Sequence, residues 1–474
     1  MFSLNYKVFT TFIPVIFMVS QAFSSVYTVP DDFTTIQYAV NELSQGDTIM
    51  IRPGVYYENI VIAGNRCLTL TSFYEAENDP GLIFETVIDG GGIDAVLSIH
   101  DNSQLTVLKG LSIRNGFSIH GGGIELYYAD LVAEDVVIRY NNTWDYWSSA
   151  GGGIYAVNCN LWMKNSEISY NSAYDYGGGV SVRTNGKAHF ENVLFFGNST
   201  INGSGHGKGA GLHCDYDAIV DLTRCIFAFN NSARWGGAFA ANSGAKLSIT
   251  NTVAFGNHAA WGGGSLYLCY YDARIDVGNS VFYLNYPQEI YFDDNNGGHS
   301  DSLIVFHSII QGGEEGVNVP PTMYLEWLEG NLDADPGFTD PENFDFSLTS
   351  GSPGIDAGTN LYVLRNDTLV NIPQEDWQGN APDIGEEESD YMTGFFENPS
   401  TGEAGIVITP NPCHDRVFIR TFDPKGRVLE MRIYDSEGKV VSEDGNMAGM
   451  SPGLYIVKVK ASNGLFFGRI LKTE

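Results

Sequence analysis

The sequence predicts an all-β protein in which a parallel β-solenoid is followed by a small antiparallel β-sandwich. Two observations favour the solenoid: glycine clusters recur every 26 to 32 residues, and apolar and polar residues alternate between them. Alternation with a period of two is typical of β-strands, and no interval between the clusters has the period of a helix. A third observation, the change of composition after Glu388, predicts a separate C-terminal domain.

The glycine clusters divide the middle of the chain into repeated units whose residues align in columns. The clusters begin at Gly121, Gly151, Gly177, Gly209, Gly236 and Gly262. One apolar column contains Leu131, Leu161, Ala188, Val220, Leu247 and Ile275, and a second contains Ala133, Met163, Phe190, Leu222, Ile249 and Val277. A unit of three short strands cannot bury its apolar face alone, so it must stack on its neighbours. The expected spacing of the coils is about 4.8 Å.

One column of the repeat is polar and consists of asparagine alone. Its members are Asn141, Asn171, Asn198, Asn230, Asn257 and Asn285. Asparagine tolerates the unusual backbone angles of a bend, and its side chain bonds locally. In stacked coils each amide can also bond to the next asparagine, which satisfies groups that would be costly to bury unpaired. We therefore predict a structural asparagine ladder.

The repeat resembles the right-handed parallel β-helix of pectate-lyase-like proteins over residues 26–385. Its "GGGI" and "N-x-x-I" spacing is also similar to the short repeats of polymorphic outer-membrane proteins. The resemblance implies a right-handed coil capped by an amphipathic N-terminal helix, here Ile36, Ala39, Val40 and Leu43. It also implies closing coils, matched by Asp335-Pro336-Gly337-Phe338, Ser352-Pro353-Gly354-Ile355-Asp356 and Asp383-Ile384-Gly385. Ala381 stands where the family often has an arginine, so the salt bridge of that arginine is not expected.

The N-terminus and the bulk composition predict an exported protein. Residues 1–22 have the apolar run and the small residues of a signal peptide. The net charge of −32 disfavours binding to nucleic acid or to an anionic membrane, and no transmembrane segment is expected in the mature protein. The six cysteines are too sparse for a disulfide scaffold. We expect most of them to be buried thiols, with a single disulfide as the alternative.

The C-terminal region is expected to comprise a linker, residues 386–405, and a β-sandwich, residues 406–474. The sandwich resembles the C-terminal sorting domain of the type IX secretion system through Pro410-Asn411-Pro412, "RIYDSEGKVV", "MSPGLYIVKV" and the terminal "GRILK". The resemblance implies contact with that secretion machinery in a Bacteroidetes-like bacterium. It also implies a secreted or outer-surface location and removal of the domain on export. The alternative is an Ig-like module that binds a surface.

Aromatic residues near the glycine clusters form the candidate ligand site. We expect Trp235 and Trp261 to lie in one column just before the glycines, together with Tyr176. Aromatic faces suit sugar rings, so we predict a glycan-binding strip made of Trp144, Trp147, Tyr174, Tyr176, Trp235 and Trp261. The alternative is that the two tryptophans stack on each other and cover a turn.

A loop rich in carboxylates gives a candidate cation site. Asp293, Asp294 and Asp301 supply hard oxygen ligands of the kind that Ca²⁺ prefers. The alternative is a solvated acidic turn. We name Ca²⁺ as the one candidate cofactor, and no catalytic residue is assigned.

These observations favour an exported or cell-surface β-helix that binds polysaccharide or another extracellular surface without catalysis. The alternative is an extracellular polysaccharide lyase or glycoside hydrolase of the same fold. The motifs of pectate lyases and polygalacturonases are missing, apart from an isolated Asp293-Asp294 pair. A purely structural or adhesive solenoid would differ from the favoured reading only in its partner.

Overall fold

The structure is a computed structural model whose secondary structure begins with the short strand β1, Val26–Val29. It describes residues 24–43, 46–144, 147–203, 205–269, 271–293, 300–389, 406–409, 418–421, 428–435, 439–442, 445–451, 453–461 and 464–472. The predicted signal peptide and most of the predicted linker lie outside the described residues, as does Pro410-Asn411-Pro412.

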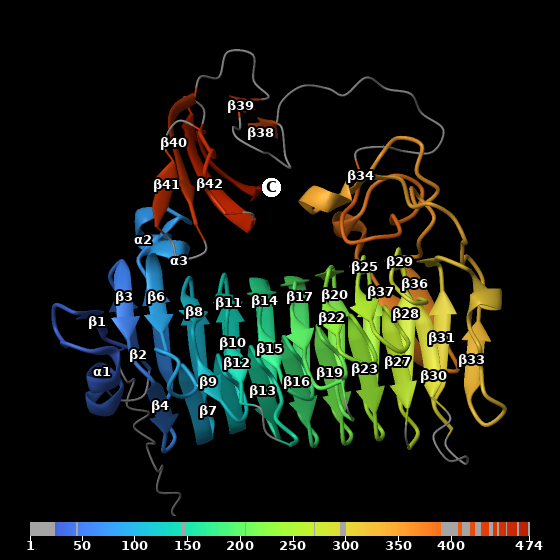
Figure 1. Ribbon diagram of the computed structural model, residues 1–474, viewed down its shortest axis with the longest axis horizontal. Helices are drawn as coiled ribbons and strands as arrows, with labels where there is room; N and C mark the ends of the chain where they lie inside the picture. The colour runs from blue at the N-terminus through green and yellow to red at the C-terminus, as the bar shows by residue number, and fades with distance from the viewer. Residues whose placement is uncertain are drawn as a thin grey trace, which may run out of the picture.

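The body of the protein is a parallel β-helix, which confirms the predicted fold class. Figure 1 shows its axis running horizontally, with successive coils side by side from the N-terminal to the C-terminal end. Each coil passes through three faces of one 27-stranded sheet and through a separate sheet of very short strands. All strand pairs between coils are parallel.

The first coils precede the regular repeats. They contain β2 (Asp47–Ile51), β3 (Gly54–Tyr57), β4 (Ile60–Ala63), β5 (Leu68–Ser72), β6 (Thr86–Asp89), β7 (Leu97–Lys109) and β8 (Ser112–Arg114). Helix α1, Ile36–Glu42, buries Ile36, Ala39 and Val40 against the first coil. Two further short helices, α2 (Tyr74–Glu77) and α3 (Leu82–Glu85), form an insertion on the outside of the third face.

The regular coils supply one strand to each face. Face one contains β10 (Ile124–Glu134), β13 (Ile154–Val157), β16 (Val180–Arg183), β19 (Leu212–Asp215), β23 (Phe239–Asn242), β27 (Leu266–Cys269) and β30 (Ile290–Asp293). Face two contains β20 (Ile219–Thr223), β24 (Lys246–Thr250), β28 (Arg274–Gly278), β31 (Ser302–Phe306) and β33 (Tyr324–Trp327). Face three contains β11 (Val137–Arg139), β21 (Ile226–Ala228), β25 (Val253–Phe255), β29 (Val281–Tyr283) and β32 (Ile309–Ile310). Strand β10 continues from face one into face two, and strands β14 (Asn160–Ser169) and β17 (Lys187–Phe196) run through faces two and three.

Six two-residue strands form the separate sheet, which we call the narrow sheet. They are β9 (Phe117–Ser118), β12 (Asn142–Thr143), β15 (Ser172–Ala173), β18 (Ser199–Thr200), β22 (Asn231–Ser232) and β26 (His258–Ala259). Its strands follow one another along the axis of the solenoid, as the labels of β9, β12, β15 and β22 show in Figure 1.

The two apolar columns read from the sequence lie in the core, together with inward residues of faces one and three. Leu161 pairs with Ala188, which pairs with Val220, and the file continues to Leu247 and Ile275. All of these side chains are buried in one cluster that extends along the whole solenoid. Equivalent residues therefore lie above one another, and the apolar side chains of each coil pack on those of the next.

The corner between face three and the narrow sheet is built by the asparagine column. The side-chain oxygen of Asn230 accepts bonds from the backbone and side-chain nitrogens of Asn198, both at 3.0 Å. The same pair of bonds recurs from Asn141 to Asn285, and every member is buried. Each side-chain nitrogen also donates to a carbonyl of the preceding coil. At its last member the ladder meets Glu289, whose carboxyl group accepts from Asn285 at 2.6 and 3.1 Å.

The glycine clusters are required by backbone crowding at the opposite bend. Gly236 has φ of +66°, and a Cβ there would lie 2.3 Å from the carbonyl oxygen of Phe239. A Cβ on Gly237 would lie 2.3 Å from the carbonyl oxygen of Gly264 in the next coil. Only glycine satisfies both the left-handed backbone and the close approach of the coils.

The last part of the body folds back over the outside of faces two and three, and Val370 packs there on Ile304 of face two. It contains η1 (Glu314–Gly316), β34 (Phe338–Asp340), η2 (Pro341–Asn343), β35 (Asp345–Leu348), β36 (Leu361–Leu364), β37 (Asp367–Asn371) and η3 (Gln374–Asp376). Phe346 and Ile384 pack on Val253 and Val281 of face three. The three closing motifs bond to one another, since the hydroxyl of Ser352 donates to the carbonyl of Pro336 at 2.5 Å and the backbone N–H of Asp356 donates to Asp383 at 2.8 Å.

The C-terminal strands form two small antiparallel sheets. They are β38 (Ile406–Thr409) with β39 (Phe418–Thr421), and β40 (Val428–Tyr434), β41 (Val440–Ser442), β42 (Gly453–Ala461) and β43 (Gly464–Lys472). In Figure 1 the four-stranded sheet lies above α2 and α3, and Lys458 forms an ion pair with Asp79. Within the described part of the chain, no helix combines the length and apolarity needed to span a bilayer.

Candidate functional site

The outer surface of face one carries a second layer of side chains above the sheet. Tyr176 precedes a glycine cluster and stacks on His213 of the next coil, with ring centroids 4.8 Å apart. Trp235 stacks on Tyr267 in the same way, at 5.3 Å and 18°. The residue before the glycines thus covers an outward residue on the face-one strand of the next coil. This contact explains why large aromatic side chains recur before the glycine clusters.

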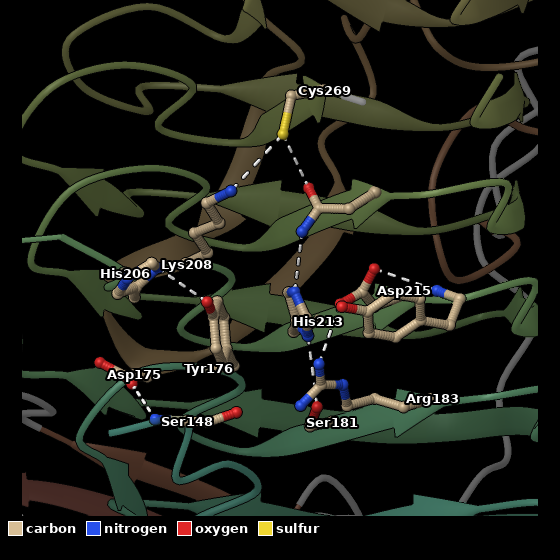
Figure 2. Close-up of polar contacts among 12 residues, drawn as sticks. Ser148, Asp175, Tyr176, Ser181, Arg183, His206, Lys208, His213, Asp215 and Cys269 are labelled. Atoms are coloured by element: carbon tan, nitrogen blue, oxygen red, sulfur yellow. Dashed lines mark hydrogen bonds and ion pairs between the residues drawn. The ribbon is translucent and has the colours of Figure 1, made fainter. Parts of the chain in front are cut away.

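Two long loops border this layer, and one buried carboxylate holds both of them. Asp175 has no exposed surface. It accepts a bond from the backbone of Ser148 at 2.5 Å and from the side chain of Asn202 at 2.6 Å. These bonds fix the loops that carry Trp147 and His206, whose rings meet edge to face at 4.7 Å. Figure 2 shows Asp175 and Ser148 beside Tyr176 and His206.

A tyrosine and a histidine meet where these loops join the layer. The hydroxyl of Tyr176 lies 2.8 Å from Nδ1 of His206. Burial raises the pKa of Tyr176, so its hydroxyl is protonated at neutral pH. The guanidinium carbon of Arg183 lies 5.4 Å from the centre of the Tyr176 ring, and Arg183 forms a 3.2 Å ion pair with Asp215. A donor hydroxyl, an imidazole and a paired cation are therefore close together.

Inside this layer, hydrogen bonds link side chains of successive coils, and the histidine among them is uncharged. Ser181 contacts Nδ1 of His213 at 3.2 Å, and Nε2 of His213 contacts Asn242 at 3.0 Å. Cys269 donates to Asn242 at 3.0 Å (Figure 2). Burial lowers the pKa of His213 well below its usual value, with the charges of Arg183 and a lysine adding to the effect. The imidazole is therefore neutral and serves as a structural link.

A buried lysine ends this chain. Nζ of Lys208 lies 3.5 Å from Sγ of Cys269 and above the rings of Trp235 and Tyr267, at 5.4 and 5.2 Å. Burial raises the pKa of Cys269 to about 12, so the sulfur remains a thiol at neutral pH. The contacts pack the cation against polarizable and aromatic groups, which stabilises it away from water.

The predicted glycan strip divides into exposed and covered members. Trp144, Trp147 and Trp261 are 47%, 72% and 58% exposed. Tyr174 and Tyr176 are partly buried. Trp235 is only 9% exposed, because Tyr267 covers one side and Arg234 lies 3.7 Å from its ring centre. Trp235 offers no open ring face to a ligand.

The placement of Trp235 and Trp261 in one column is wrong. Trp235 pairs with Gly262, so Trp261 lies one residue out of the column. The glycine with positive φ in that coil is Gly263, whereas in the preceding coil it is Gly236. Three residues separate Asn257 from Trp261, whereas four separate Asn230 from Trp235. Trp261 therefore lies one position earlier in its coil, and its side chain projects into solvent. The two tryptophans do meet, at 67° and 5.5 Å, with the guanidinium of Arg234 against both.

The carboxylates of the predicted Ca²⁺ loop have separate partners where the structure describes them. Asp293 accepts a 2.7 Å bond from the hydroxyl of Tyr267, and Asp301 accepts one from the backbone of Ala273 at 2.8 Å. Asp294 lies outside the described residues. Over the described ranges, no group of three acidic, histidine or cysteine side chains is arranged to hold a metal ion. The five described cysteines are free thiols.

Sequence reasoning did not assign His213, Asn242, Tyr267 or Cys269 to the site. The signal was present, because the strands that follow the glycines alternate and their second and fourth residues point outward. These positions read as part of a buried core because many of them are apolar or small in other coils. In the structure, the side chains that precede the glycines cover these outward positions. The alternation of residues along a strand does not reveal such a cover.

Two family models match separate segments of the chain. Residues 92–296 match the family described as "Right handed beta helix region". Residues 407–473 match the "Secretion system C-terminal sorting domain". A search of curated proteins finds no match.

Solved structures of carbohydrate-active enzymes are among the similar chains. The crystal structure of pectate lyase Pel9A is 13% identical, covers 77% of this chain and 97% of its own, and has a TM-score of 0.47. The pectin methylesterase from Aspergillus niger in deglycosylated form is also 13% identical, covers 66% of this chain and 86% of its own, and has a TM-score of 0.28. At these TM-scores neither similarity carries an argument about activity. The strand topology and the two family matches together establish that this chain combines a right-handed parallel β-helix with a C-terminal sorting domain of the type IX secretion system.

Proposed function

We propose that this protein, once exported, binds polysaccharide along the loops that join the narrow sheet to face one, which we call the loop edge, and does not catalyse a reaction on it. The observation that carries the proposal is the exposure of Trp144, Trp147 and Trp261 at that edge. Exposed indole faces at a fixed edge are unusual on a soluble protein and suit the apolar faces of sugar rings. The sorting domain supports export, which places the edge where extracellular polysaccharide is available.

The experiment compares paired tryptophan variants in affinity electrophoresis through gels that contain soluble polysaccharide. The variant Trp147→Ala with Trp261→Ala is expected to lose retention by roughly thirtyfold, since each sugar ring stacked on an aromatic residue contributes on the order of 1 kcal/mol and two such contacts are removed. The matched control is Trp162→Ala, because Trp162 is 43% exposed but lies on β14, on face two. Equal retention of the double variant and the control would contradict the proposal.

A second candidate function is β-elimination of a polyuronate, and one observation favours it. A lyase needs a group to remove the proton beside the carboxylate, a donor for the leaving oxygen and a cation near the carboxylate. Tyr176, His206 and Arg183 lie close enough to fill those roles. Ultraviolet absorbance of unsaturated products from polygalacturonate and alginate tests this function. Activity that Tyr176→Phe abolishes would replace the binding proposal with catalysis.

A further inference from the structure

A band without charged residues crosses seven coils over the narrow sheet. It comprises residues 115–119, 140–144, 170–174, 197–201, 229–233, 256–260 and 284–286, none of which is Asp, Glu, Lys or Arg. This protein has 57 acidic and 25 basic residues, and the outward positions of face two include Lys164, Glu191, Asp221 and Asp276. The charge-free band is therefore a distinct surface on a strongly acidic molecule.

The centre of the band is a row of hydroxyl, amide and aromatic side chains, one per coil. In each two-residue strand the first side chain points outward, and from β12 to β26 the second is buried. The outward row consists of Phe117, Asn142, Ser172, Ser199, Asn231, His258 and Tyr286. Six steps of about 4.8 Å give the row a length of roughly 29 Å.

Contacts between coils hold the row in place. The hydroxyls of Ser199 and Ser172 lie 3.1 Å apart, and Nδ1 of His258 lies 3.0 Å from Asn231. A serine hydroxyl has one donor and two acceptor sites, so each keeps hydrogen-bonding capacity toward solvent after this contact. The row is thus a fixed array of groups that exchange hydrogen bonds with hydroxyls.

Aromatic pairs lie at both ends of the row. Phe117 stacks on Trp144 with centroids 5.5 Å apart and 15° between the rings. At the other end His258 stacks on Tyr286 at 5.3 Å and 12°. Phe117 is 36% exposed and Tyr286 is 62% exposed, so both pairs present ring surface to a ligand. Ring faces at the ends and hydroxyl-binding groups between them fit a chain of sugar rings that lies along the axis.

We infer that the charge-free band binds one extended strand of a neutral polysaccharide, parallel to the solenoid axis. This inference rests on the proposed function and names the ligand class and its path. An anionic polysaccharide would find no cation in the band to compensate its carboxylates, while the net charge of −32 would repel it. A neutral chain loses little on leaving water, because its hydroxyls exchange water for the amides and hydroxyls of the row.

The test places a charge in the middle of the row. Ser199 on β18 points outward, so the fold should tolerate the substitution Ser199→Glu. The new carboxylate would lose its hydration under a bound polysaccharide chain, which should weaken binding. The matched control is Ser248→Glu, because Ser248 is also a half-buried outward serine, on β24 of face two. Binding of the full chain to a soluble neutral β-glucan and to polygalacturonate is measured by affinity electrophoresis and titration calorimetry. Thermal melts check that both variants are folded.

We expect retention by the neutral glucan, weakened about tenfold or more by Ser199→Glu and unchanged by Ser248→Glu. Retention by polygalacturonate alone would overturn the inference and leave the proposed function standing. So would neutral binding that Trp147→Ala weakens and Ser199→Glu does not. Failure to bind any polysaccharide would overturn both. A dimer in sedimentation that Ser199→Glu dissociates would assign the band to a second copy of this chain and overturn the inference.

Discussion

Removing one member of the asparagine ladder should destabilise the solenoid more than its size suggests. The side chain of Asn230 donates to the carbonyl of Phe195 at 3.0 Å and to Asn257 at 2.9 Å. Its oxygen accepts from the backbone and side chain of Asn198, both at 3.0 Å. Asn230→Ala deletes these four bonds and leaves buried partners unsatisfied. At about 1 kcal/mol for each net bond, we expect a loss of about 4 kcal/mol in the free energy of unfolding.

Urea unfolding measures that loss, and hydrogen exchange locates it. The backbone amide of Asn198 should exchange faster in Asn230→Ala, because its acceptor is gone. The control is Asn231→Ala, since Asn231 is adjacent in sequence but exposed, and we expect its effect to stay within about 0.5 kcal/mol. A loss below about 1 kcal/mol, or equal losses for the two variants, would refute the reasoning.

Three further predictions concern other positions. Burial raises the pKa of Glu289 from 4.5 to about 8, so the unfolded state ionises first and stability should fall as pH rises between these values, by up to roughly 5 kcal/mol. Glu289→Gln should flatten that dependence in urea unfolding at about pH 5 and about pH 9, and an unchanged slope would contradict it. Gly236→Ala should destabilise the protein by more than about 1 kcal/mol in the same assay, because its Cβ would lie 2.3 Å from a carbonyl oxygen. Asp175→Asn should speed hydrogen exchange in both loops that Asp175 holds, and unchanged exchange there would show that its bonds do not fix them.

Much of the solenoid could be predicted because every coil requires the same type of residue at the same position. The file from Leu161 to Ile275 and the ladder through Asn198 can be read from the sequence, since a parallel stack places equivalent positions directly above one another. The glycine with positive φ is also recoverable, because no other residue fits the bend. These features are local rules repeated many times.

The exposure of individual aromatic side chains could not be predicted in this way. Trp235 and Trp261 occur in similar sequence contexts, yet one is buried and the other projects into solvent. Trp261 stands one residue earlier in its coil than Trp235 does, because Trp235 pairs with Gly262, and Arg234 covers Trp235. Likewise, the path of the closing segment over face three depends on apolar contacts such as Phe346 with Phe255, which are distant in sequence and belong to no repeat.

The in-register stacking of the coils has a consequence for how this molecule could evolve. Because the strands of a coil pair only with those of its two neighbours, duplication or deletion of a unit that the closing segment does not cover would change the length of the solenoid by one strand spacing and leave the remaining strand pairs as they are. Related proteins that gained or lost units would thus have solenoids whose lengths differ in steps of about 4.8 Å. Such variation needs no redesign of the interior, since every junction between coils is built to the same pattern.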